Sequence, residues 1–534
     1  MITVAGVKDV FREGMAGGWQ VIDAGQLSQD SEVECDVVII GSGAGGGTSA
    51  EILSAAGLSV IVVEEGPLRT SNDFSMDERQ AYRDLYQEGA ARSSDDGAIM
   101  ILQGRSVGGS TTVNWTSSFR TPEPTLNTWA EVFGVRGMSP AEMAPWFERM
   151  EQRLDIQAWP LAANANNASL ALGCERLGYS HGVMHRNVRG CWNLGYCGMG
   201  CPTNAKQSML VTTLPSALAQ GARLYHRARA WRLIVEGDRV LGVSCVGMHE
   251  DRIRPTGVAL RIRARHTVLA GGGINTPALL LRSQVPDPYR NVGRRTFLHL
   301  VDASRADFDQ AIDAGHGAPQ SVYSDHFVWR DGVAGPLGYK LEVMPLHPAI
   351  TASLLGESGE ELHASMLRYR SMSMMIALMR DGFHEQSLGG RVLLRDDGSP
   401  VLHYPLTDYV RDGLRRSLLT MAEIQFAAGA RQVRPLHRDA QACTRWSEAQ
   451  AMIASLPMEK LLLRLGAAHV MGGCAMGEDE RRCVTDSQGR LRSMRDVSVI
   501  DGSLFPTSIG ANPQLSIYGL AAKLATTLAA QLRA

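Results

Sequence analysis

A glycine-rich turn near the N-terminus has residue types and a spacing that suit phosphate binding. Residues 41–47 read GSGAGGG, which places Gly41, Gly43 and Gly46 in a Gly-x-Gly-x-x-Gly pattern, and Glu64 ends the next apolar run. Glycine permits a tight turn and lets the backbone approach a pyrophosphate, while an acid can accept hydrogen bonds from ribose hydroxyls. These residues predict a dinucleotide-binding site.

The segments around this turn are typical of a strand–helix–strand unit. Residues 36–40, DVVII, form an apolar, β-branched run that predicts a buried strand. TSAEILSAAG predicts a helix that stops at Gly57, and LSVIVVE predicts a second strand that ends at Glu64. A helix that begins directly after the glycines would direct free N–H groups and its positive end at the phosphates.

Later segments contain further glycine-rich or catalytically suggestive sequences. Residues 268–281, VLAGGGINTPALLL, predict a strand, a tight turn and a helix with Thr276 as cap and Pro277 at the first position. Three more segments belong to this group: GRSVGGSTTVN at 104–114, HVMGGCAMG at 469–477, and IDGSLFPTSIGANPQLSIYGLA at 500–521.

The overall composition narrows the class of protein. The chain is long enough for two or three domains, is 44% hydrophobic, and has a formal net charge of -2. Without a basic field, nucleic acid is not expected as a partner. The sequence has no run of eighteen apolar residues and no signal-peptide pattern, so we expect a cytoplasmic protein without a membrane-spanning segment.

Taken together in this order, the five motifs resemble the glucose–methanol–choline (GMC) oxidoreductases. The resemblance runs from about residue 35 to the C-terminus and is strongest to cholesterol oxidase-like and long-chain alcohol dehydrogenase-like members. It implies FAD as the cofactor. It also implies an α/β (α+β overall) fold, in which a Rossmann-type FAD-binding domain is interleaved with a substrate domain built on an antiparallel sheet.

The family architecture implies discontinuous domains. We expect residues 30–130, 190–300 and 460–534 in the FAD-binding domain, and 131–189 and 301–459 in the substrate-binding domain. Within the latter, 391–406 reads as two short strands around a DDG turn. It leads into a segment with helical spacing that stops at Gly429.

The resemblance also implies the site residues. His469 occupies the family's catalytic histidine position and would act as the base, and Asn512, which cannot be a base, would orient the hydroxyl or stabilise an oxyanion. Pro513 would begin the last helix near the flavin. The residues expected to bind the cofactor are Gly41, Gly43, Ala44, Gly46, Glu64, Gly66, Arg105, Gly109, Ser110, Asn114, Asp501, Gly502, Asn512 and Pro513.

These residues imply oxidation of an alcohol to an aldehyde or ketone by hydride transfer to flavin N5. Four methionines in residues 371–379 favour an apolar substrate, although they would serve equally well as core residues. We expect a dehydrogenase that passes electrons to a quinone or carrier protein. An oxygen-using oxidase that releases hydrogen peroxide and a non-redox, FAD-containing lyase stay open as alternatives.

Three cysteines, Cys191, Cys197 and Cys201, stand within eleven residues. Their spacing is poor for tetrahedral zinc, and it matches only the end of a ferredoxin-type iron–sulfur run. No metal site is predicted. Whether these thiols hold an iron–sulfur cluster or pack in an ordinary loop stays open at this point.

Overall fold

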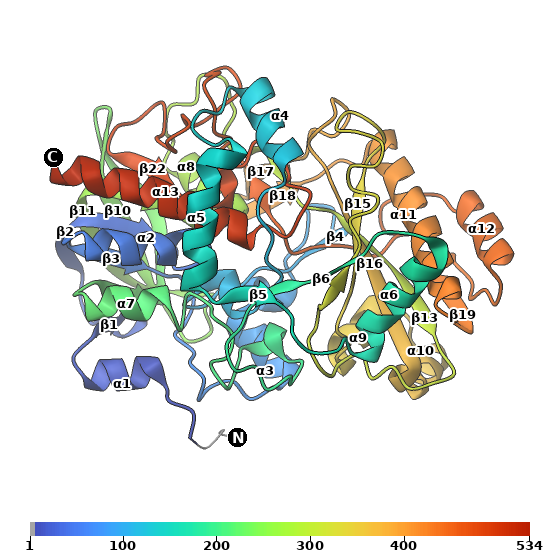
Figure 1. The fold of residues 1–534 in the computed structure, drawn as a ribbon. Coiled ribbons are helices and arrows are strands. Elements are labelled where there is room, and N and C mark those ends of the chain that lie inside the picture. Colours follow the sequence, from blue (N-terminus) through green and yellow to red (C-terminus); the bar gives the residue numbers. More distant parts are fainter. Residues whose placement is uncertain (1–5) are drawn as a thin grey trace.

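The computed structural model describes residues 6–534, and segments from distant parts of the sequence gather in each of its two halves (Figure 1). One half combines most of the first 300 residues with the C-terminal helix α13 (Gln514–Arg533). The other half is built mainly from residues beyond 300, with helix α6 from an earlier segment. The mixed α/β fold with interleaved segments confirms the predicted fold class.

An eight-stranded sheet forms the core of the first half. Its buried central strands, such as VIVV in β3, are apolar throughout, as expected for parallel strands covered on both faces. Strands β1, β8, β3, β2 and β11 pair in parallel in this order, and β22 pairs in parallel with β11. Strands β11, β10 and β9 form an antiparallel meander. The strands in order are β1 (Gln20–Asp23), β8 (Arg223–His226), β3 (Val60–Val63), β2 (Ser31–Ile40), β11 (Pro255–Leu269), β10 (Arg239–Met248) and β9 (Ala228–Glu236), with β22 (Val497–Val499) beside β11.

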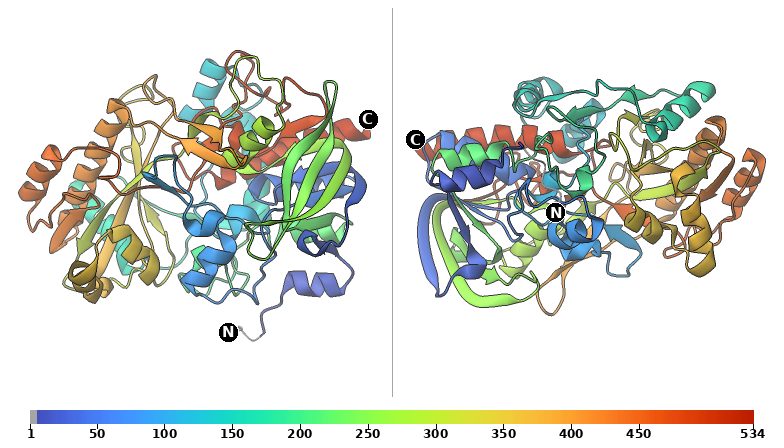
Figure 2. Two further views of the ribbon diagram at one scale, coloured as in Figure 1. Left: turned by 180° about the vertical axis from the view of Figure 1, so that it is seen from behind. Right: turned by 90° about the horizontal axis from the view of Figure 1, so that it is seen from below.

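Helices α2, α7 and α13 lie along one side of this sheet (Figures 1 and 2), and α13 packs against both α2 and α5. The predicted unit is confirmed, because β2 leads through the glycine turn into α2, which ends at Ala55, and then into β3. The helices of this half are α1 (Val10–Ala16), α2 (Ala44–Ala55), α3 (Glu78–Leu85), α4 (Glu123–Phe133), α5 (Pro140–Arg153), α7 (Thr213–Ala219), α8 (Gly272–Arg282) and α13 (Gln514–Arg533).

A six-stranded sheet forms the core of the second half. All of its pairings are antiparallel except that of β20 with β4. The strands are β15 (Tyr339–Val343), β16 (Met372–Met379), β13 (Val301–Asp307), β20 (Leu465–Ala467) and β4 (Ile99–Ile101), with β19 (Gln432–Pro435) also beside β13. Strands β4 and β20 come from segments that we expected in the FAD-binding domain. The six-stranded sheet therefore contains strands from both expected domains.

The helices of the second half pack on this sheet and around its rim. Helix α11 contacts β13, β16 and β19 and also packs on α6 and α12. It begins at Asp408 and ends at Ala427, which confirms the helix predicted before Gly429. The helices are α6 (Ala165–Leu177), α9 (Pro348–Leu355), α10 (Gly359–Leu367), α11 (Asp408–Ala427) and α12 (Trp446–Ser455).

A four-stranded sheet lies where the halves meet. It contains the predicted hairpin, which the structure confirms as β17 and β18 in antiparallel pairing. Its strands in order are β18 (Pro400–His403), β17 (Gly390–Leu394), β12 (Arg294–Phe297) and β21 (Met471–Gly472), and the two remaining pairs are β14 (Val322–Tyr323) with β6 (Gly182–Val183) and β5 (Ile156–Ala158) with β7 (His185–Asn187). Among the residues described, no helix is both long enough and apolar enough to cross a bilayer.

The prediction that Thr276 caps a helix beginning at Pro277 is wrong. Helix α8 begins at Gly272, and Pro277 lies inside it. The Thr276 hydroxyl instead accepts from the Gly271 N–H at 2.9 Å and donates to Asp501 at 2.7 Å. A Thr–Pro pair is a local signal for a helix start, but here the helix already begins five residues before the proline, at Gly272.

Helix α11 offers a test of how the second half is stabilised. Leu418 is fully buried in the core that α11 shares with the six-stranded sheet. We expect Leu418→Ala to lower the free energy of unfolding by roughly 2–5 kcal/mol, because the truncation leaves a cavity. Leu461, which is 62% exposed, provides the matched control. Leu461→Ala should change the free energy of unfolding by less than about 0.5 kcal/mol. Equal losses in denaturant melts of the two variants would contradict this packing.

Candidate active site

A single cavity of about 1110 Å³ runs between the two halves of the molecule. One end is lined by the glycine turn of residues 41–45, and the other by apolar side chains of β13 and β16. A pocket for one small molecule usually has a volume of roughly 300–1,000 Å³, so this cavity has room for a large cofactor and a substrate together.

The glycine turn fits the cavity end as a phosphate cradle. Gly41 has a φ of 105°, and a side chain there would meet the Ala270 carbonyl oxygen at 2.3 Å. A Cβ on Gly46 would lie 1.8 Å from the Gly41 oxygen, so this glycine allows the helix to pack against the turn. Gly43 differs, since a Cβ there would contact only Gly109, at 3.8 Å, and would otherwise enter the open cradle.

Glu64 lies directly after β3, at the carboxyl end of the parallel strands. Its carboxylate accepts hydrogen bonds from the Ser42 N–H and hydroxyl at 3.1 and 2.6 Å and from the Gly66 N–H at 2.8 Å. Burial raises the pKa of Glu64 despite these donors. A carboxylate has about four acceptor positions, so one is left for a ribose hydroxyl.

The loop of residues 104–114 follows the cavity wall. The Asn114 side-chain amide donates to the side-chain oxygen of Gln514, at the start of α13, at 2.7 Å. Lys206 binds the backbone of the same loop. The buried ammonium of Lys206 donates to the carbonyl oxygens of Thr112, Asn114 and Cys197 at 2.8, 2.8 and 2.6 Å. This lysine fixes the position of Asn114, and no sequence signal pointed to it.

Asp501 joins two chain segments at the cavity wall. Its carboxylate accepts from the Gly272 N–H at 2.7 Å and from the Ser503 N–H at 2.8 Å, in addition to the Thr276 hydroxyl. Burial raises the pKa of Asp501, and these hydrogen bonds oppose the increase. The acid therefore acts as a structural joint between α8 and the segment that leads to α13.

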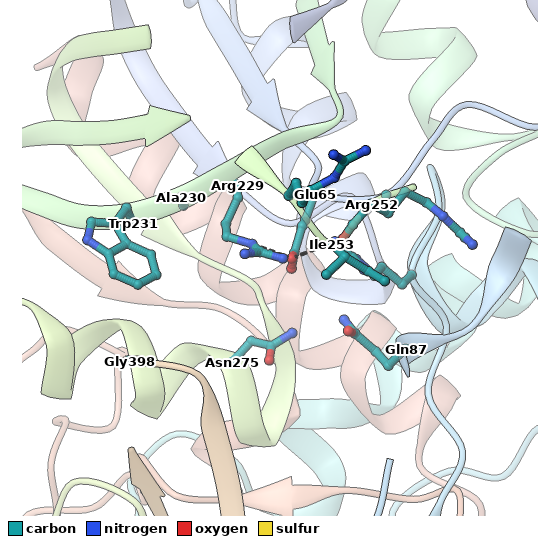
Figure 3. A network of polar contacts seen from close by, with 12 residues as sticks. Glu65, Gln87, Arg229, Ala230, Trp231, Arg252, Ile253, Asn275 and Gly398 are labelled. Atoms are coloured by element: carbon teal, nitrogen blue, oxygen red, sulfur yellow. Dashed lines mark hydrogen bonds and ion pairs between the residues drawn. The ribbon is translucent and has the colours of Figure 1, made fainter. Parts of the chain in front are cut away.

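Arginines surround Glu65 at the end of the cavity nearest the glycine turn. Glu65 binds Arg105 at 2.9 Å and Arg229 at 2.7 Å, and Figure 3 shows Arg229 turned towards Glu65 with Gln87 and Asn275 across from them. Burial disfavours the charge on Glu65, but the two guanidinium groups outweigh it and lower its pKa to about 2. Buried nitrogens of Arg105 and Arg252 have no hydrogen-bond partner, so donors are left for an anion.

His469 and Asn512 both line the cavity. His469 pairs through Nδ1 with Nδ1 of His299 on the segment after β12, at 3.3 Å. Burial, with a smaller contribution from Lys340, lowers the pKa of His469 to about 3. The imidazole is therefore neutral over the whole physiological range.

Asn512 is held between two opposite charges carried by β15. Its Oδ1 accepts from the Lys340 ammonium at 3.2 Å, and its Nδ2 donates to Glu342 Oε2 at 3.3 Å. Gln320 also donates to the same carboxylate oxygen, at 2.6 Å. The sequence did not indicate the two partners of Asn512, Lys340 and Glu342, because their only signal was a Lys-x-Glu pair in a short strand.

Most of the predicted site residues line the same cavity, with two exceptions. Gly46 and Gly66 lie behind the wall, where Gly46 packs on Gly41 and Gly66 donates to Glu64. The predicted residues that line the cavity are Gly41, Gly43, Ala44, Glu64, Arg105, Gly109, Ser110, Asn114, His469, Asp501, Gly502, Asn512 and Pro513.

The cysteine loop contains Cys191, Cys197 and Cys201, each of them partly exposed. Over residues 6–534, no group of three or more His, Cys, Asp or Glu side chains is arranged to hold a metal ion. All nine cysteines are free thiols. Cys197 instead contributes its carbonyl oxygen to the shell around Lys206, and its sulfur lies 3.5 Å from Arg186.

The residues present fit FAD. A glycine cradle at a helix N-terminus, an acid at the end of the second strand and unpartnered arginine nitrogens suit a pyrophosphate and ribose. When bound, FAD supplies the hydride acceptor.

Two glycine variants test this fit. Gly43→Ala should leave the free energy of unfolding of the apoprotein almost unchanged, but should reduce FAD binding at least tenfold, because the new methyl group enters the open cradle. Gly46→Ala should destabilise the fold itself by about 1–3 kcal/mol, because its Cβ meets the Gly41 oxygen. Thermal melts of apoprotein and FAD titration separate the two effects, and FAD binding that is unchanged in Gly43→Ala would contradict the cradle.

Comparison with known proteins is consistent with this site. The family description GMC oxidoreductase matches residues 82–301 and 386–521, and an FAD binding domain matches residues 36–99. Among solved structures, a pyridoxine 4-oxidase from Mesorbium loti superposes with a TM-score of 0.68 at 17% identity and covers 92% of this chain and 99% of its own. A formate oxidase variant from Aspergillus oryzae has a TM-score of 0.68 at 15% identity and covers 94% and 99%. At these identities the two structures support the fold alone.

Curated relatives extend over nearly the whole chain. An uncharacterized GMC-type oxidoreductase of Mycobacterium tuberculosis is 32% identical over 511 residues, covering 95% of this chain and 78% of the relative. A long-chain-alcohol oxidase of Arabidopsis thaliana is 30% identical over 515 residues, covering 92% of this chain and 66% of the oxidase. The chain belongs to the GMC oxidoreductase family and is an FAD-dependent oxidoreductase acting on CH–OH donors.

Proposed function

We propose that this enzyme oxidises an apolar alcohol, with the carbinol carbon held between the flavin and the pair His469–Asn512. The observation that carries the proposal is the continuity of the cavity. The cradle suited to FAD, the two polar side chains and a chamber with apolar walls line one continuous cavity.

The walls of the chamber come mainly from alternate residues of the six-stranded sheet. Met374, Ile376 and Leu378 of β16 share one face and line the cavity, whereas Met372, Met375 and Met379 are buried elsewhere. Only one methionine of the 371–379 cluster thus supports the substrate argument made from the sequence. The other apolar side chains that line this end are Met100, Val301, Ala303, Met344, Leu354, Leu436 and Leu465.

Residues of the chain position the alcohol and exclude water. The apolar walls hold the hydrocarbon part, so that the hydroxyl group meets His469 and Asn512, which lie at the polar end of the chamber. Both side chains can hydrogen-bond the carbinol oxygen as negative charge develops on it. Apolar walls around these hydrogen bonds strengthen them relative to hydrogen bonds in water.

The named relatives support the choice of substrate class. Four long-chain-alcohol oxidases of Arabidopsis thaliana match this chain at 26–30% identity. Their name describes an alcohol with a long hydrocarbon chain, which fits the lining of the chamber.

A chain-length series tests the substrate class. We expect 1-dodecanol to bleach the flavin under anaerobic conditions, with the second-order rate constant for reduction rising about fourfold per CH2 group from 1-butanol upwards, because each buried CH2 contributes about 0.8 kcal/mol. Glucose is the polar control. If glucose reduces the flavin faster than 1-dodecanol, the apolar assignment fails, and if no alcohol bleaches it, a non-redox role is favoured.

The electron acceptor is a separate prediction. We propose a dehydrogenase, so reoxidation of the reduced enzyme by a soluble quinone should be at least tenfold faster than by air-saturated buffer. Stopped-flow reoxidation combined with a peroxide assay measures both routes. One hydrogen peroxide per alcohol oxidised, at an unchanged turnover rate without quinone, would establish the oxidase alternative instead.

A further inference from the structure

Arg464 differs from the other arginines that line the cavity. Each of the others binds at least one carboxylate or carbonyl oxygen, and they are Arg92, Arg105, Arg229, Arg252, Arg282 and Arg395. Over residues 6–534, the guanidinium group of Arg464 makes neither an ion pair nor a hydrogen bond, and the residue is exposed. Its positive charge is therefore available to a ligand in the cavity.

The backbone around Arg464 places it in the wall of the apolar chamber. The Arg464 N–H donates to the Leu436 carbonyl oxygen at 2.9 Å, and the Leu436 N–H donates to the Ala303 oxygen at 2.9 Å. Leu436 and Ala303 both line the cavity, and Ala303 pairs with Ile376 of β16. Arg464 thus belongs to the same part of the cavity as the apolar side chains that we assigned to the substrate.

The guanidinium group of Arg464 lies against the end of α9. Gly356 follows that helix with a φ of 64°, and a Cβ there would lie 2.0 Å from Arg464 Nη2. Leu354, two residues earlier, lines the cavity. A cation also suits the negative end of a helix, so a purely structural role for Arg464 has to be tested beside a role in binding.

The acids that follow Gly356 are bound to a different arginine. Glu357 and Glu361 each lie 2.9 Å from Arg434 Nη1. A carboxylate that enters the chamber would therefore find the Arg464 guanidinium without an acidic partner from the described residues.

The spacing between Arg464 and His469 limits the length of a ligand that reaches both. His469 lies five positions after Arg464, with β20 between them. A strand rises about 3.3 Å per residue, so the two Cα atoms are at most roughly 16 Å apart. A zigzag hydrocarbon chain with bonds of about 1.5 Å advances roughly 1.25 Å per bond. A chain of about twelve carbon atoms matches this separation.

We propose that the preferred substrate is a long-chain ω-hydroxy acid, whose hydroxyl group meets His469 and Asn512 and whose carboxylate binds Arg464. This inference rests on the proposed function and names its substrate class. The carbinol carbon loses a hydride to bound FAD, and the hydroxyl group loses its proton to His469. The product is the ω-oxo acid, and the carboxylate at Arg464 is unchanged by the reaction.

The chemistry of arginine suits this task. A planar guanidinium group can donate two parallel hydrogen bonds to one carboxylate, and such charge-assisted bonds are roughly twice as strong as neutral ones. Because Arg464 is exposed, the bound carboxylate keeps part of its hydration while the methylene groups lie along the apolar wall. The charge of the substrate is confined to that end, and its hydroxyl end is neutral.

A ligand without a hydroxyl group tests binding separately from catalysis. We expect dodecanoate to bind the FAD-loaded enzyme in calorimetry, and Arg464→Met to weaken its binding about tenfold or more, because hydrogen bonds to a charged group are lost. Arg438→Met is the matched control, since Arg438 is 70% exposed, pairs with Asp439 and does not line the cavity. Equal affinities in wild type and Arg464→Met would overturn the proposal.

Anaerobic flavin reduction tests the substrate class. In wild type, the second-order rate constant should be about tenfold or more higher for 12-hydroxydodecanoate than for 1-dodecanol, and Arg464→Met should abolish this preference while 1-dodecanol reacts as before. Arg464→Glu should invert the order and favour 12-amino-1-dodecanol, which carries an ammonium group at the same place. A preference for the hydroxy acid that survives in Arg464→Glu would contradict the assignment.

The shorter pair of 6-hydroxyhexanoate and 1-hexanol tests the spacing. The hydroxy acid should lose its advantage over the alcohol at this length, because a short chain cannot reach both Arg464 and His469. An equal advantage at both lengths would show that Arg464 attracts anions without binding the end of the substrate, and would overturn the proposal.

Two further outcomes separate the possible failures. If the role of Arg464 is in binding, Arg464→Met should shift the thermal unfolding midpoint by less than about 4 °C. A larger shift together with unchanged substrate preference would establish a structural role instead. A wild-type flavin that no alcohol bleaches would overturn the proposed function and this inference together. Normal bleaching by 1-dodecanol without a preference for the hydroxy acid would overturn this inference alone.

Discussion

Close approach of glycine backbone to neighbouring carbonyl groups is the constraint on which the cofactor site depends. A Cβ on Gly41 would lie 2.3 Å from the Ala270 oxygen, and one on Gly45 would lie 1.9 Å from the Ile500 oxygen. Three segments that are hundreds of residues apart can therefore meet only where side chains are missing. This meeting places the N-terminus of α2, the start of α8 and the segment before α13 around one cavity.

The two ends of that cavity hold charge in different ways. At the cofactor end, Arg105 and Arg229 share one carboxylate, Glu65, and buried arginine nitrogens are left for an anion. At the substrate end, Lys340 and Glu342 balance each other, and Asn512 bridges them. An apolar chamber beside a balanced ion pair suits a neutral alcohol, because neither charge needs a counterion from the substrate.

Sequence reasoning worked where the chemistry is encoded locally. The strand, glycine turn and helix around Gly41 depend on adjacent residues, and the structure confirms them. The start of α8 was mispredicted because Thr276 and Pro277 imitate a local helix signal. The pair Lys340–Glu342 could not be found, since Lys-x-Glu in a strand normally indicates an exposed face. Only the covering of β15 by other elements makes it a buried pair beside Asn512.

A crystal structure of the enzyme with FAD and a non-oxidisable tertiary long-chain alcohol is the most direct test of the central claim. We predict that the isoalloxazine ring lies beside Asn114 and Pro513. The alcohol oxygen should lie within hydrogen-bond distance of His469 Nε2 and Asn512 Nδ2, with its hydrocarbon chain along Met374, Ile376 and Leu378. A hydroxyl group bound away from both His469 and Asn512, or a hydrocarbon chain outside the apolar chamber, would contradict the account.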